Sequence, residues 1–125
     1  MDFKKLKQTR TADVPSLLEG LGFRLIAPRA KVYLNHKENL IIKKGNLLYD
    51  ICQESPLYPF LIETRLVKDA SEFEWIVQPR ARRGEYARKA LRQIREAVGN
   101  KYFMEGDIHI GNTGYYMGKP ILFDW

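Results

Sequence analysis

Three polar side chains near the C-terminus have the types and the spacing of a phosphoryl-transfer site. Asp107 can accept a proton from an attacking hydroxyl, and Asn112 and Asp124 carry oxygens that can hold Mg²⁺. This cation favours one or two carboxylates with carbonyl oxygens, phosphates and waters completing its octahedron. Between Asn112 and Asp124 the sequence predicts two short strands joined by the turn 117–120. Because a hairpin brings its ends together, we expect Asn112 and Asp124 to finish side by side.

The motif Asp107-x-His109-x-x-Asn112, with Phe123-Asp124-Trp125 after it, resembles the catalytic and metal-binding loops of the protein kinase-like superfamily. It is most similar to the branch of aminoglycoside phosphotransferases and small bacterial kinases, where a G-D-x-H-x-x-N loop and an I-D-W triplet are typical. Two features depart from that pattern. Glu105 stands where the superfamily usually has histidine, and the sequence stops one residue after Asp124, without an activation segment or further helices.

The resemblance spans residues 21–125 and implies an α+β, minimal kinase-like fold in a single domain. Residues 1–77 would form an N-terminal lobe built on a small antiparallel sheet, and 78–81 a hinge. Residues 82–125 would form a truncated C-terminal lobe of one main helix, the catalytic loop and the hairpin.

Local patterns predict the elements that must position these residues. A polar arm, 1–11, precedes a short helix that begins after Asp13 and stops at the glycines of 20–22. Alternating apolar residues and turn signals then predict several strands and a helix. The predicted strands are 23–27, 31–35, 39–44, 60–67 and 72–77, and the helix is 46–55.

The segment 83–98 is the clearest helix, because apolar residues recur on one face and arginines on another. Gly99 supplies its stop. We expect this helix to pack under the catalytic loop with its apolar stripe in the core. The stripe consists of Tyr86, Ala90, Leu91, Ile94, Ala97 and Val98.

In the resembling family a lysine on the third strand binds the α and β phosphates, and Leu40-Ile-Ile-Lys43 matches that strand. Lys43 is therefore the expected phosphate ligand. Lys44 is the alternative, since neighbouring strand residues point to opposite faces. The glutamate that pairs with this lysine would be Glu54, near the end of the predicted helix, or Glu63.

The hinge of the resembling family binds adenine through backbone groups, which here would come from Val77, Gln78 and Arg80. Pro79 has no N–H to offer. His109 could donate to the transferred phosphate, and it could equally bond within its own loop.

These roles together imply in-line transfer of the γ-phosphoryl group of ATP to a hydroxyl, with Asp107 orienting the acceptor and Mg²⁺ neutralising charge. The acceptor would be a protein or the chain itself. An alternative is a catalytically inactive kinase-like module that acts through a partner protein. A homodimer, covering surface that a short second lobe leaves exposed, stays open.

Composition and charge limit the cellular compartment and the partners expected for this protein. The chain has 125 residues and one cysteine, Cys52, which excludes an internal disulfide and fits a reducing, cytoplasmic compartment. No apolar run reaches the length of a membrane span. The net charge of +6 is concentrated in 4–10 and 80–95. It permits a nucleic-acid partner, but a solvated basic face is the favoured interpretation because no base-reading motif accompanies it.

Overall fold

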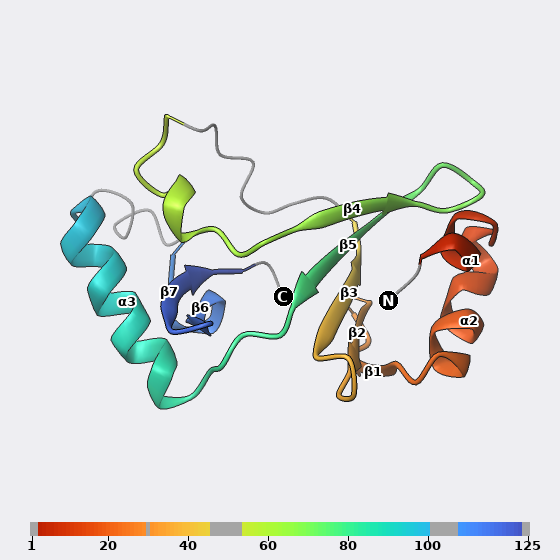
Figure 1. The fold of residues 1–125 in the computed structure, drawn as a ribbon, viewed down its shortest axis with the longest axis horizontal. Coiled ribbons are helices and arrows are strands. Elements are labelled where there is room, and N and C mark those ends of the chain that lie inside the picture. The colour runs from red at the N-terminus through yellow and green to blue at the C-terminus, as the bar shows by residue number, and fades with distance from the viewer. Residues whose placement is uncertain (1–2, 30, 46–53, 101–107, 124–125) are drawn as a thin grey trace. The chain divides into compact units, whose positions relative to one another are not determined.

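The computed structural model describes residues 3–29, 31–45, 54–100 and 108–123, which form two compact α+β units. The first unit contains the described residues up to 45 together with 63–80, and the second contains 54–62 and 81–123 (Figure 1). Within the described ranges, every helix is too short or too polar to cross a membrane.

A five-stranded antiparallel sheet forms the first unit, with strand order β1-β2-β3-β5-β4. Turn residues set its register. The side chain of Asn35 accepts a hydrogen bond from the N–H of Glu38 (3.0 Å), and Asn39 adopts a positive φ of 53° before β3 begins. The strands are β1 (Arg24–Ala27), β2 (Val32–Asn35), β3 (Leu40–Lys44), β4 (Arg65–Lys68) and β5 (Glu74–Pro79).

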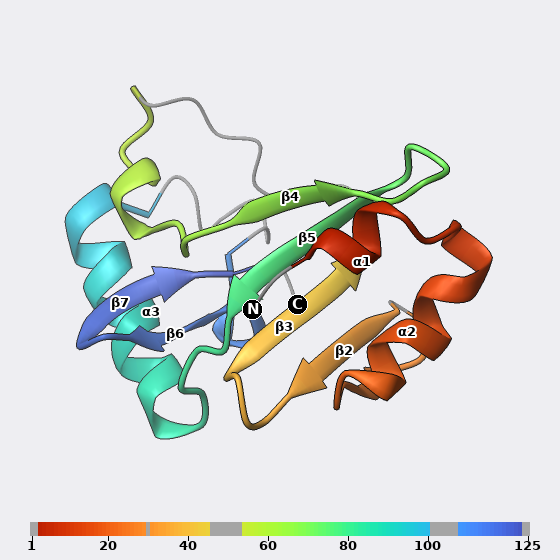
Figure 2. The same ribbon diagram turned by 45° about the vertical axis from the view of Figure 1, so that its right-hand side comes forward.

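Two short helices, α1 (Lys4–Lys7) and α2 (Val14–Gly20), cover one face of this sheet (Figure 2). A 3-10 turn, η1 (Thr11–Asp13), joins them. Asp13 occupies the N-cap of α2 as predicted, although its side chain makes no capping hydrogen bond. The core on this face combines residues of both helices with sheet residues: Phe3, Leu6, Val14, Leu18, Phe23, Tyr33, Ile42, Val67, Trp75 and Val77.

The opposite face of the sheet carries a second apolar cluster of Val32, Leu34 and Ile41. Side chains two residues apart along a strand share a face. Lys43 therefore lies on the same face as Ile41, whereas Lys44 shares the helix-covered face with Ile42.

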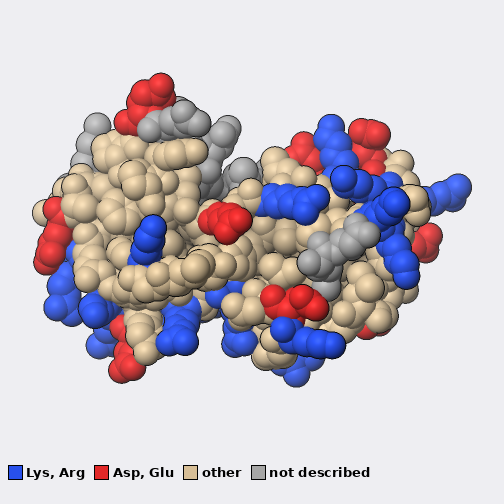
Figure 3. Space-filling model, in the orientation of Figure 1, with Lys and Arg blue, Asp and Glu red and all other residues tan. Residues whose placement is uncertain are grey.

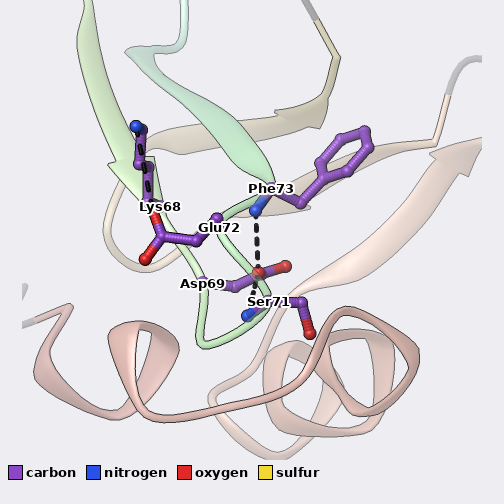
Figure 4. Close-up of polar contacts among 5 residues, drawn as sticks. All are labelled: Lys68, Asp69, Ser71, Glu72 and Phe73. Atoms are coloured by element: carbon purple, nitrogen blue, oxygen red, sulfur yellow. Dashed lines mark hydrogen bonds and ion pairs between the residues drawn. The ribbon is translucent and has the colours of Figure 1, made fainter.

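Asp69 connects the β4–β5 turn to the N-terminal segment. Its carboxylate, only 3% exposed, accepts hydrogen bonds from the Thr11 hydroxyl (2.6 Å) and the Trp75 indole N–H (3.0 Å). It also accepts the backbone N–H groups of Ser71 and Phe73 at 2.8 and 3.0 Å (Figure 4). Burial alone would raise the pKa of Asp69, but these four hydrogen bonds outweigh it and lower the pKa below its ordinary value.

The second unit packs the long helix α3 (Glu85–Val98) against a two-stranded hairpin, β6 (Thr113–Tyr116) and β7 (Lys119–Leu122) (Figure 1). Two 3-10 turns complete it, η2 (Tyr58–Phe60) and η3 (Ile110–Asn112). Its core is formed by Leu57, Ile94, Ile108 and Leu122, with Phe60, Leu61, Leu91 and Val98 partly buried around them.

The structure confirms the first three strands, the β4–β5 hairpin, the last hairpin and α3 with its Gly99 cap, each within a few residues. Three expectations were wrong. The arm 1–11 contains α1, because Phe3 and Leu6 are buried in the core. The strand predicted for 60–67 begins only at Arg65, after η2. β5 runs to Pro79, into the expected hinge.

The stripe of α3 also differs in detail. Ala90 and Ile94 are buried as predicted, but Ala87 replaces Ala97 in the core, and Tyr86 is 39% exposed. The helix predicted for 46–55 lies almost wholly outside the described residues.

Candidate functional site

The loop after Asp107 is closed by two of the predicted side chains. Asp107 itself lies outside the described residues, and Ile108 begins the visible loop with its side chain buried. His109 Nδ1 accepts the N–H of Gly111 at 3.0 Å, and Asn112 Oδ1 accepts the N–H of His109 at 3.0 Å. The two side chains thus cap the η3 turn reciprocally. Of the two roles open to His109, bonding within its own loop is the one seen.

The hairpin places Phe123, the residue before Asp124, beside Asn112. The N–H of Phe123 donates to the carbonyl oxygen of Asn112 at 3.0 Å, and the next pair inward is Thr113 with Leu122. Asp124 follows Phe123 directly but lies outside the described residues, so the position of its carboxylate is a prediction.

The turn of this hairpin is tighter than the sequence predicted. Only Met117 and Gly118 form it, both with positive φ (50° and 75°), as a two-residue turn of this kind requires. Lys119 and Pro120, assigned to the turn in advance, pair within β7 instead. Pro120 has no N–H to donate, which is tolerated in a strand of a two-stranded sheet.

Close contacts fix the loop and hairpin on α3, the helix predicted to pack under this loop. Thr113, fully buried, directs its hydroxyl at the carbonyl of Ala87 at 3.1 Å. Gly114 approaches the backbone of Arg82 so closely that an added Cβ would overlap the Arg82 carbonyl oxygen. Next to that contact, the backbones of Arg82 and Tyr115 donate to each other, with hydrogen bonds of 2.8 and 3.0 Å.

Lys43 and Lys44 lie on different faces of β3. Lys43 is half-buried, is paired with Val32 and Ile76, and shares the face that carries the second apolar cluster. Lys44 places its Nζ 4.8 Å from the centre of the Phe73 ring, on the helix-covered face. The geometry therefore gives the two lysines different neighbours, and only Lys43 has an environment away from the N-terminal helices.

The candidate glutamates are exposed. Glu54 lies in a turn that follows the undescribed segment 46–53, and Glu63 lies in the irregular segment before β4. Glu63 forms no ion pair within the part of the chain that the structure describes. The pairing of a glutamate with Lys43 stays a prediction.

The three hinge candidates have well-defined surroundings. Val77 is buried among the core residues under α1 and α2, and both its strand neighbours pair with it. Gln78 is 3% exposed and donates to the Thr64 hydroxyl at 3.0 Å. The N–H of Arg80 donates to the carbonyl of Asn39 at 3.0 Å. To bind adenine, the Arg80 N–H would have to give up its hydrogen bond to Asn39.

Two contributors to the loop were missed by sequence reasoning. Thr113 and Gly114 hold the hairpin against α3, but the strand pattern predicts only that they belong to a strand. The available signal was their position directly after Asn112. A small residue pair between a polar loop and an apolar strand is typical of a close backbone approach.

Carboxylates that could hold a metal together are not found among the described residues, where no three His, Cys, Asp or Glu side chains cluster. Asp107 and Asp124 fall outside those ranges. Of the expected magnesium ligands, the structure describes only Asn112. Comparisons with protein-family models, with curated proteins and with solved structures found no match to this chain.

Proposed function

We propose that this protein is a kinase-like phosphotransferase that transfers the γ-phosphoryl group of ATP to a hydroxyl of a protein or of itself. The single observation that carries the proposal is the Phe123-to-Asn112 hydrogen bond. It closes the hairpin one residue before Asp124, as a paired Asn–Asp metal site in this sequence requires. If the two motif fragments occurred in this chain by chance, nothing would require the hairpin to pair Phe123 with Asn112.

Each residue has a defined role in the proposed reaction. Asp107 orients the acceptor hydroxyl and takes its proton; a positioned base of this kind contributes about 10²–10⁴ in rate. Asn112 and Asp124 would hold Mg²⁺, which would supply positive charge to the phosphates, and Lys43 would neutralise the α and β phosphates. Catalysis of phosphoryl transfer rests on such positioning and charge neutralisation more than on covalent chemistry.

The folded loop supports these roles by preorganisation. His109 and Asn112 hold each other through backbone and side-chain hydrogen bonds, so the metal-side oxygen of Asn112 is positioned by folding. A carbonyl oxygen can accept two contacts, and the bond from the His109 N–H is therefore compatible with metal ligation at the same atom. Preorganised ligands spare the ordering cost at the moment of binding.

Thermal melting with nucleotide tests binding first. At 100 times its dissociation constant, ATP with Mg²⁺ adds about 2.7 kcal/mol to the stability of the folded state. We expect the melting temperature of the ATP-binding part to rise by roughly 10 °C. Chelation of Mg²⁺ with EDTA should remove most of that shift, because Asn112 and Asp124 would hold the metal and the metal would supply positive charge to the phosphates.

Adjacent lysines provide a matched control. Lys43→Met should reduce the ATP-dependent shift and label transfer from γ-³²P-ATP, whereas Lys44→Met, which removes the same charge from the other face of β3, should leave both near wild type. Asp107→Ala should abolish transfer while the shift persists. Binding without transfer in the wild type would select the inactive module. Absence of both would refute the proposal.

A further inference from the structure

Two tyrosines and two cations of the second unit form a continuous surface cluster. Arg82 places its guanidinium carbon 5.9 Å from the centre of the Tyr86 ring, and Lys89 places its Nζ 5.7 Å from the centre of the Tyr115 ring. The two rings meet edge to face, 6.0 Å apart at 64°. We name Arg82, Tyr86, Lys89 and Tyr115 the tyrosine patch.

The fold makes this arrangement specific. Tyr86 and Lys89 are separated by three residues on α3 and so share a face of the helix. Tyr115 comes from β6, and the backbone bridge between Arg82 and Tyr115 holds that strand beside the start of the helix. The Tyr115 hydroxyl donates to the side chain of Gln93, one turn further along α3, which fixes its ring.

The patch is open and positively charged. Arg82, Tyr86 and Lys89 are exposed, Tyr86 by 39%. Within the described chain, neither Arg82 nor Lys89 forms an ion pair with a carboxylate. Residues 82–95 contain six Arg and Lys side chains but only one carboxylate, Glu85. In Figure 3, positive side chains lie around the end of α3 from which the helix starts, and acidic side chains lie among them.

We propose that the tyrosine patch binds single-stranded nucleic acid, with a base stacked on the exposed ring of Tyr86 and the flanking phosphates on Arg82 and Lys89. Proteins that bind single strands combine a cationic track with aromatic rings, because every base has a face that can stack. A duplex hides those faces inside its stack, and an acidic peptide would gain from the charges but not from an open ring. The proposal does not depend on phosphoryl transfer.

Fluorescence anisotropy with a labelled oligouridylate of about twelve nucleotides, within the usual site sizes, measures this binding. For single strands the logarithm of the binding constant falls with the logarithm of salt by about 0.7 for each phosphate neutralised. We expect Arg82→Gln/Lys89→Gln to weaken binding and to reduce the salt slope by about 1.4.

The same helix offers the matched control. Arg88→Gln/Arg92→Gln removes two exposed charges from α3 that contact no ring among the described residues. It should lower affinity less than the patch variant. Tyr86→Leu keeps the charge and should weaken binding by at least about fivefold, whereas Tyr86→Phe, which keeps the ring, should bind like wild type. Thermal melting confirms that each variant is folded.

Three results would overturn the proposal. The first is no binding at low salt. The second is equal loss in the two double variants together with wild-type binding by Tyr86→Leu, which would indicate a general basic surface. The third is competition by polyglutamate as effective as by unlabelled oligouridylate, which would indicate an acidic protein as the partner. None of these readouts involves ATP, so they are independent of the test of phosphoryl transfer.

Discussion

Substitution of Asp69 by asparagine isolates the value of a buried carboxylate in the first unit. One carboxylate oxygen accepts the backbone N–H groups of Ser71 and Phe73, and the other accepts the Thr11 hydroxyl and the Trp75 indole N–H. Asparagine has only one such oxygen. If it keeps the two backbone bonds, its NH₂ group faces the indole N–H, and two donors oppose each other.

The expected cost follows from the burial of the indole. Trp75 is 1% exposed, so water cannot replace the lost acceptor. An unsatisfied buried donor costs about 1–3 kcal/mol, and a hydrogen bond to a charged group contributes about 1.5–3 kcal/mol. The Thr11 hydroxyl can rotate and accept from the amide, which limits its share. We therefore expect Asp69→Asn to reduce the free energy of unfolding by about 2–4 kcal/mol.

Urea denaturation followed by tryptophan fluorescence measures this loss. A Trp125→Phe background leaves Trp75 as the single tryptophan, so the signal reports the first unit. With a slope of about 2 kcal/mol/M, the midpoint should fall by roughly 1–2 M. Glu72→Gln is the control in the same turn. It removes only the exposed Lys68–Glu72 ion pair of 3.8 Å and should cost less than about 0.5 kcal/mol. Equal, small effects of both substitutions would refute the reasoning.

Two further predictions follow from the same contacts and from the hairpin. Because the folded-state pKa of Asp69 is lowered, its stabilisation is present above the ordinary carboxyl pKa and is lost as pH falls through the folded value; urea midpoints measured from pH 6 downward should fall less steeply in Asp69→Asn. Gly114→Ala should destabilise the second unit by about 1–3 kcal/mol, because its Cβ overlaps the Arg82 carbonyl, whereas Gly20→Ala, with open space around the added carbon, should be neutral or slightly stabilising in urea melts followed by circular dichroism.

Elements with a strong local pattern were predictable from the sequence. The apolar face of α3 repeats at helical spacing, and Gly99 ends the helix with a φ of 86°. The first three strands are separated by short turns that contain proline or polar and charged residues. Where tertiary contacts decide, prediction failed. Residues 4–7 are helical because Phe3 and Leu6 find partners in a core built by distant strands, and no local signal marks them.

The candidate site also combines features that the sequence predicts with features that it does not. The sequence predicted that Asn112 lies near the far end of the hairpin, but not that it pairs with Phe123, because the predicted turn 117–120 is two residues longer than the observed one. The faces of Lys43 and Lys44 were not, because β3 carries adjacent isoleucines, Ile41 and Ile42, that are both buried. A strand buried on both faces has no alternation to read. Only the positions of α1 and α2 distinguish the two lysines.

In the proposed mechanism, Asn112 would serve both the fold and the metal site. Its Oδ1 fixes the His109 backbone, its own carbonyl accepts the Phe123 N–H, and it is 5% exposed. All of these bonds are between atoms of the protein itself, so folding determines the loop geometry. In the proposed mechanism Asn112 and Asp124 would hold Mg²⁺, and Asn112 would need no further ordering to do so. His109 contributes to this arrangement by holding the turn. Its Nδ1 accepts the N–H of Gly111, and its backbone N–H keeps the Asn112 oxygen in place.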